Sequence, residues 1–201
     1  YPVGVKAVAD PLFNVFLEIN GIDRRAVDTR PVGASDVATI IAGAVDCEFT
    51  TFAVNEPNTM RNQGVEPVVF LLSENGLPSQ SNVYFTSEKT LAEHRDVLAR
   101  WLRATKAAWE RFMVDPDEAA SWQVKSGLVD GLDLTQQTQQ AEEMVPLMAG
   151  GPGLLALDRP TWEKMQANML NSAELDKPVD LDKLLDTSLM TEVGAPTGAD
   201  R

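Results

Sequence analysis

The sequence predicts an α/β fold that is built on a parallel sheet. Three short segments, residues 3–8, 27–32 and 44–49, are predicted to be strands: 3–8 contains a β-branched run, and 44–49 is mostly apolar and bounded by turn signals, as in a buried strand. Helical patterns of apolar residues separate these segments, so that strands and helices alternate from residue 3 to residue 49. This order is typical of a doubly wound sheet with right-handed crossover connections.

The ends of the first two helices carry recognisable signals. Asp10-Pro11 places a proline at the first position of the first helix, where its missing N–H is not needed. Ser35 is a suitable N-cap for the second helix, and Gly43 suits its C-terminal end. The apolar face of the first helix is predicted to contain Leu12, Val15, Phe16 and Ile19.

The remainder of the chain is predicted to be mostly helical. The turn-rich segment 73–81 is a candidate boundary between two parts of the chain. Residues 194–201 are rich in glycine and small residues, and we expect them to form a disordered tail. Strands are expected at 67–72 and 82–86, and helices at 57–63, 91–114, 116–125, 134–148 and 161–170.

Composition excludes several classes of protein. The chain has 201 residues and a formal net charge of −13, which argues against binding to nucleic acid or to an anionic membrane surface. Solubility of an acidic protein explains this charge without any partner. No apolar run approaches the length of a membrane-spanning helix, and a single cysteine rules out an intramolecular disulfide.

Signatures of catalysis are absent from the sequence. It contains no nucleophile elbow, no dinucleotide or phosphate loop, and no cluster with the spacing of metal ligands. His94 is the only histidine and lies in a polar helical segment, which favours a solvated surface residue. Cys47 lies in a predicted strand, which favours a small buried side chain over a nucleophile. We therefore expect a protein that is not an enzyme and has no cofactor or metal.

Polar residues follow the predicted strands, at the edge where open α/β sheets bind their ligands. Thr50, Thr51, Asn55 and Glu56 come after the third strand, and Asp10 comes after the first. Glu56 suits either of two roles, as the start of a helix or as a carboxylate that accepts an N–H group of a ligand. The negative charge of Asp10 favours a nitrogen heterocycle over an oxyanion, and Phe13 and Phe52 are expected to supply apolar contacts.

Short motifs in a fixed order extend over nearly the whole chain. They include Gly4-Val5-Lys6, Asn20-Gly21-Ile22-Asp23, Gly43-Ala44-Val45-Asp46, Asn55-Glu56-Pro57-Asn58 and Leu157-Asp158-Arg159-Pro160. With these motifs the chain resembles the extracytoplasmic solute-binding proteins of ATP-driven (ABC) importers, in the nitrate/sulfonate/taurine and thiamine-precursor group. Each motif is weakly specific, and the order and spacing of the set carry the resemblance.

The resemblance implies a type II periplasmic-binding-protein-like fold, with two α/β lobes joined by hinge crossover strands. On that template residues 3–79 form the second lobe, and residues 80–193 return to the first lobe with a helical C-terminal part. The N-terminal part of the first lobe is expected to be missing from this sequence. The family's site positions carry over to Ala9 and Asp10, to Gly33 and Ser35, and to the segment from Thr50 to Glu56.

The resemblance also implies a function and partners. We expect a periplasmic or extracellular monomer, with a lipid anchor as an open alternative, that delivers a small organic solute to the membrane permease of an importer. The favoured ligand is a thiamine-precursor-like nitrogen heterocycle, with Glu56 as its anchor. A sulfonate, nitrate or taurine-type oxyanion is the alternative, for which Arg30 is a candidate cation. An enzyme of thiamine-pyrimidine synthesis is disfavoured, because that branch of the family has a cysteine-rich segment and an active-site histidine.

Overall fold

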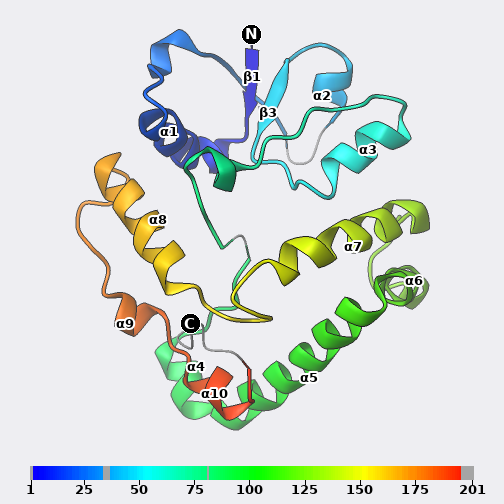
Figure 1. Ribbon diagram of the computed structural model, residues 1–201, viewed down its shortest axis with the longest axis vertical. Helices are drawn as coiled ribbons and strands as arrows, with labels where there is room; N and C mark the ends of the chain where they lie inside the picture. Colours follow the sequence, from blue (N-terminus) through cyan, green and yellow to red (C-terminus); the bar gives the residue numbers. More distant parts are fainter. Residues whose placement is uncertain (1, 34–36, 81, 196–201) are drawn as a thin grey trace. The chain divides into compact units, whose positions relative to one another are not determined.

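The computed structural model describes residues 2–33, 37–80 and 82–195 (Figure 1). These residues form two compact units. The first unit contains the described residues up to Ser79 together with Lys164–Pro178. The second unit contains Gln80–Glu163 and the described residues from Val179 onward.

A three-stranded parallel sheet forms the centre of the first unit (Figure 1). Its strands are β1 (Pro2–Val5), β2 (Asp28–Pro31) and β3 (Cys47–Phe49), in the order β2-β1-β3. The register pairs Val5 with Pro31 on one side and with Phe49 on the other. The predicted parallel α/β arrangement is confirmed, and the chain leaves all three strands at one edge, which we call the carboxyl edge.

Helix α1 (Asp10–Ile19) covers the sheet with an apolar face, but of the four predicted residues only Val15 is fully buried, and Leu12, Phe16 and Ile19 are partly buried. Phe13, Val15 and Leu17 are buried against Val5 of β1 and Phe49 of β3. The rings of Phe13 and Phe49 pack edge to face with their centroids 4.8 Å apart, a favoured aromatic geometry. This core fixes the carboxyl ends of β1 and β3 relative to each other.

Short elements connect the strands of the first unit. Helix α2 (Ala38–Ile41) ends at Gly43, whose φ of +69° is one that glycine adopts without steric cost. Helix α3 (Glu56–Asn62) follows β3, in place of the predicted helix 57–63. The other elements are the 3₁₀ turns η1 (Ala7–Ala9), η2 (Arg24–Ala26) and η3 (Leu72–Asn75), and helix α8 (Arg159–Asn171), which belongs to this unit from Lys164 onward.

Two predicted strands are wrong. Residues 67–72 and 82–86 have strand-like composition, but the structure assigns no strand to either segment. Val68, Phe70 and Phe85 are largely exposed, so these side chains are not held against a core. A strand needs a neighbouring strand to pair with, and sequence composition does not reveal whether one is present.

The second unit is helical, as the sequence predicts. Its helices are α4 (Glu88–Glu93), α5 (Arg95–Val114), α6 (Pro116–Ser126), α7 (Leu134–Ala149), α9 (Leu181–Leu184) and α10 (Ser188–Glu192). Ser87, Asp115 and Asp133 cap α4, α6 and α7 with their side chains. The predicted helix 91–114 is interrupted at His94, where φ of −131° separates α4 from α5.

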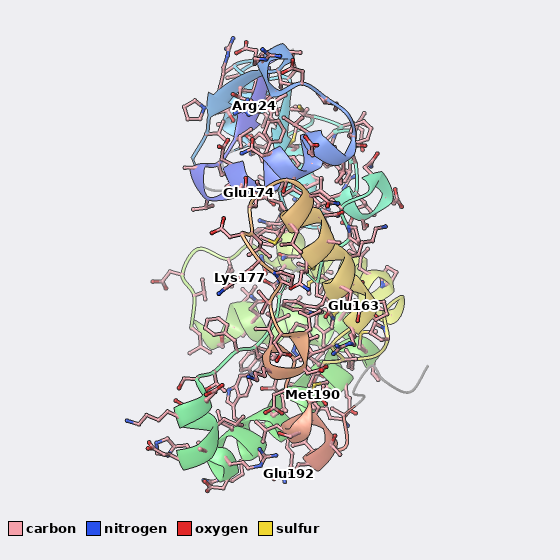
Figure 2. The ribbon with its side chains drawn as sticks, turned by 90° about the vertical axis from the view of Figure 1, so that its left-hand side faces the viewer. Arg24, Glu163, Glu174, Lys177, Met190 and Glu192 are labelled. Atoms are coloured by element: carbon pink, nitrogen blue, oxygen red, sulfur yellow. The ribbon has the colours of Figure 1, made fainter. Side chains whose placement is uncertain are left out.

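Helix α10 packs on α5 and closes the core of the second unit. Met190 and Leu102 are buried in one cluster, and Arg95 pairs with Glu192 at 3.1 Å; Met190 and Glu192 are labelled in Figure 2. Ala195 is buried in the same cluster and its amide donates to the carbonyl of Met190. Ala195 lies within the tail 194–201 that the sequence predicts to be disordered, and residues 196–201 lie outside the described residues.

The first unit contains two separate stretches of the chain. The first stretch ends at Ser79, within the turn-rich segment 73–81, and the second stretch is Lys164–Pro178. The predicted lobes, residues 3–79 and 80–193, stay a prediction. In the described ranges, no helix is both long and apolar enough to span a membrane.

Candidate functional site

Lys6 and the loop after β3 meet at the carboxyl edge of the sheet. Lys6 directly follows β1, and its Nζ donates to the carbonyl oxygen of Thr50 at 3.3 Å. The same Nζ lies 3.7 Å from Oε1 of Glu56, and Oε2 of Glu56 accepts the backbone N–H of Phe52 at 2.9 Å. These contacts join the end of β1 to the loop 50–56, which leads from β3 into α3.

The side chains of Lys6 and Glu56 are both largely buried, which strengthens the electrostatic contact between them. The Glu56 side chain is only 3% exposed and that of Lys6 is 14% exposed. Oε1 of Glu56 is buried and accepts no hydrogen bond, so the ammonium of Lys6 is the charge that faces it. The carboxylate thus holds the loop through the N–H of Phe52, and it is not open to a solute in this conformation.

The loop 50–56 exposes an aromatic ring. Phe52 is 54% exposed, whereas Thr51 and Asn55 are half-buried. Thr50 has a φ of +63°, a left-handed conformation that is unfavourable for a β-branched residue. The fold thus holds an unusual backbone conformation two residues before the exposed ring.

Asp10 belongs to a second group, on the β2 side of β1. A hollow of about 320 Å³ is lined by Asp10, Arg24, Thr29 and Arg30, and by Val5, Ala7 and Pro31. One Arg24 nitrogen donates to Oγ1 of Thr29 at 2.9 Å, and another lies 3.4 Å from Oδ1 of Asp10. Because Arg24 offsets the charge of Asp10, that charge no longer argues against an oxyanion.

A second hollow of about 400 Å³ lies beside the C-terminal half of α1. Its lining includes Asn14, Glu18, Arg24 and Glu174, of which Arg24 and Glu174 are labelled in Figure 2. Asn14 donates to Glu174 at 3.4 Å. Neither this hollow nor the one beside Asp10 is lined by any residue of the loop 50–56.

The structure therefore divides the predicted site residues. Thr50, Phe52 and Glu56 share one set of contacts, and Asp10 lies with Arg24 in another. Phe13 is 3% exposed and packs in the core, so its predicted apolar contact with a ligand is not available in this conformation. Ala9 is buried, Gly33 is exposed, and Ser35 lies outside the described residues.

The structure also places the residues that were considered for catalysis. His94 is exposed, as expected, but Cys47 is exposed and not a buried core residue, because it lies in β3, a strand at one side of the sheet. Partial burial of the sulfur, followed by the charges of Asp46 and Glu48, raises the pKa of the Cys47 thiol and disfavours a reactive thiolate. The described residues contain no group of three or more acidic, histidine or cysteine side chains that could hold a metal ion.

The sequence does not identify Lys6 and Arg24 as residues of the candidate site. Lys6 belongs to a family motif, and its position directly after a strand is the signal that could have identified it. Arg24 lies 14 positions after Asp10, and no local pattern links the two residues. Only the packing of η2 beside α1 reveals that pair.

Comparison with known proteins identifies the family. The sequence model of the NMT1/THI5-like family matches residues 3–119, which is more than half of the chain. The chain belongs to the NMT1/THI5-like family. The matched range contains the sheet except for its first residue, and it contains Lys6, Arg24 and the loop 50–56, so the resemblance seen in the sequence is confirmed.

Two curated relatives of this NMT1/THI5-like chain are named as binding proteins and not as enzymes. The riboflavin-binding protein RibY of Chloroflexus aurantiacus is 26% identical over 172 residues, which cover 83% of this chain and 48% of that protein. The formylaminopyrimidine-binding protein of Halalkalibacterium halodurans is 27% identical over 113 residues, which cover 56% of this chain and 34% of that protein. The chain thus spans about half, or less, of the length of these relatives.

Proposed function

We propose that this chain is part of an extracytoplasmic solute-binding protein of an ABC importer, and that it binds a small organic solute without altering it. The membership of the NMT1/THI5-like family and the names of the two relatives support this proposal. Its partners would be a small molecule and the membrane permease of the importer. The chain would act as a monomer outside the cytoplasm.

The favoured ligand is a flat nitrogen heterocycle. Riboflavin and formylaminopyrimidine, named in the two relatives, both contain a planar nitrogen ring system. The observation that carries the proposal is the exposed ring of Phe52 on a loop that Lys6 and Glu56 tie to β1. A fixed aromatic ring at the carboxyl edge of a parallel sheet offers a stacking surface for such a ligand.

The other predicted residues have distinct parts in this proposal. Thr51 and Asn55 would supply polar contacts beside Phe52, and Gly33 and Ser35 would contribute backbone groups after β2. Asp10 would act together with Arg24 and not as an isolated charge. Glu56 would act through the loop and not as a direct anchor, because its carboxylate is buried.

An oxyanion remains the second candidate ligand. The hollow beside Asp10 is lined by two arginines, Arg24 and Arg30, and its one carboxylate is paired. A sulfonate, nitrate or taurine could be attracted to these guanidinium groups. This observation favours an oxyanion more than the sequence did.

The test is a binding titration on the intact protein of which this chain is part. We expect riboflavin or formylaminopyrimidine to bind, and F52A to weaken the binding by about 5- to 30-fold, because losing an aromatic contact costs about 1–2 kcal/mol. F85A is the matched control, since Phe85 is also exposed but belongs to the second unit. The proposal fails if neither compound nor a related heterocycle binds. If taurine or nitrate binds instead, the second candidate replaces the first.

A further inference from the structure

We propose that Lys6 is a positioning residue for ligand binding, because it holds the loop 50–56 in the conformation that exposes Phe52. This inference rests on the proposed function for its effect on binding. Lys6 acts on the ring of Phe52 indirectly, through Thr50 and Glu56.

The contacts of Lys6 place it between two ends of the loop. It donates to the carbonyl oxygen of Thr50, where the loop begins, and its ammonium faces Oε1 of Glu56, where the loop ends in α3. Glu56 in turn accepts the N–H of Phe52 with Oε2. The ammonium group of Lys6, directly after β1, therefore constrains the chain both before and after Phe52.

The two contacts have different physical effects. The hydrogen bond at Thr50 holds a residue whose φ of +63° is unfavourable for threonine, so the bond opposes relaxation of the backbone at that point. The ion pair offsets the negative charge of a carboxylate that is almost fully removed from water. Without the ammonium, the buried carboxylate of Glu56 loses its compensating charge and is expected to turn toward water, which weakens its contact with the N–H of Phe52.

The rest of the first unit does not depend on Lys6. The core beneath the loop is formed by apolar contacts among Val5, Phe13, Val15 and Phe49. Lys6 follows β1 and is not one of the residues of the strand ladder. Loss of the ammonium should therefore loosen the loop more than it loosens the sheet.

The experiment compares K6M, which keeps the length of the side chain without its charge, with K6R, which keeps the charge. K106M is the matched control, because Lys106 is also a paired lysine, 2.6 Å from Glu110, but lies in the second unit. The first measurement is hydrogen exchange at the backbone amide of Phe52 without ligand. The second is the Kd for riboflavin and for formylaminopyrimidine.

We expect K6M to speed exchange at Phe52 by at least about 10-fold while the amides of β1 and α1 keep their protection. We expect K6M to raise the Kd by about 10-fold. In K6R, both the exchange rate at Phe52 and the Kd should stay close to the values of the unmodified protein. Unchanged exchange at Phe52 in K6M would overturn the inference, and so would faster exchange with an unchanged Kd. A general loss of protection across the first unit, which K6R does not reverse, would show that Lys6 serves folding and would also overturn it.

The two proposals can fail separately. If the unmodified protein binds neither heterocycle, the proposed function fails for this ligand class. In that case the exchange measurement at Phe52 still decides whether Lys6 holds the loop. If the protein binds and K6M behaves like K106M, the proposed function stands and the role of Lys6 is rejected.

Discussion

Replacing Gly4 by alanine should destabilise the first unit, because the central strand has no room for a side chain there. A Cβ at position 4 would lie 2.8 Å from Cγ1 of Val32 and 3.0 Å from Cγ of Glu48. Real Cβ atoms do not approach carbon atoms so closely, so Val32 or the backbone of β1 must move. Val32 is β-branched and has few alternative rotamers.

The second neighbour, Glu48, has little freedom to make space. Oε1 of Glu48 accepts a hydrogen bond from the hydroxyl of Thr39, and Oε2 is buried without a hydrogen bond. Overpacking of this kind costs about 1–3 kcal/mol. With a urea slope of about 2 kcal/mol/M, a loss of about 2 kcal/mol would lower the midpoint of urea unfolding by about 1 M.

The assay must report on the first unit. All four tryptophans, Trp101, Trp109, Trp122 and Trp162, belong to the second unit, so their fluorescence does not follow the sheet. Hydrogen exchange of the amides of β1 at increasing urea concentration follows the affected region, whereas far-UV circular dichroism is dominated by the helices of the second unit. G33A is the matched control, because nothing lies within 4 Å of a Cβ at that position. A G4A variant as stable as G33A would refute the packing argument.

Two further predictions concern the second unit, where tryptophan fluorescence is a suitable readout. L102A should lower the free energy of unfolding by about 2–4 kcal/mol, because Leu102 is buried with Met190, whereas L128A at an exposed position should change it by less than about 0.5 kcal/mol. Hydrogen bonds from Ser188 lower the pKa of Asp186, so the folded state favours the charged carboxylate. Because Asp186 is exposed and solvent screens its interactions, D186N should cost no more than about 0.5 kcal/mol at pH 7. This difference from the unmodified protein should disappear as the pH falls from about 3.9 through the lowered pKa of Asp186. A difference that persists in acid would contradict the assignment.

The helices could be predicted well because their signals are local. The proline after Asp10 at the start of α1 and Gly43 after α2 act within a few residues of the helix that they begin or end. The predicted strands 67–72 and 82–86 failed for the opposite reason. A strand depends on a neighbour that lies elsewhere in the chain, and the composition of Val68 or Phe85 does not show whether that neighbour exists.

The sequence predicts which segments of the chain lie near one another better than it predicts the contacts between them. The rule that ligands bind at the carboxyl ends of parallel strands points to the segments after β1 and β3, and the structure brings these two segments into contact at Lys6. The roles of individual residues were less predictable. Phe13 proved to be core, and Cys47 proved to be exposed, because burial depends on which elements cover each side of the sheet.

The sequence by itself determined the alternation of strands and helices, the ends of most helices and the family of the protein. Only the tertiary structure decided that Lys6 lies against Thr50, 44 positions away, and that Arg24 offsets the charge of Asp10. Local signals depend on residues that are neighbours in the chain. Charge pairing and burial depend on distances in space, and those distances exist only once the sheet and its covering helix have formed.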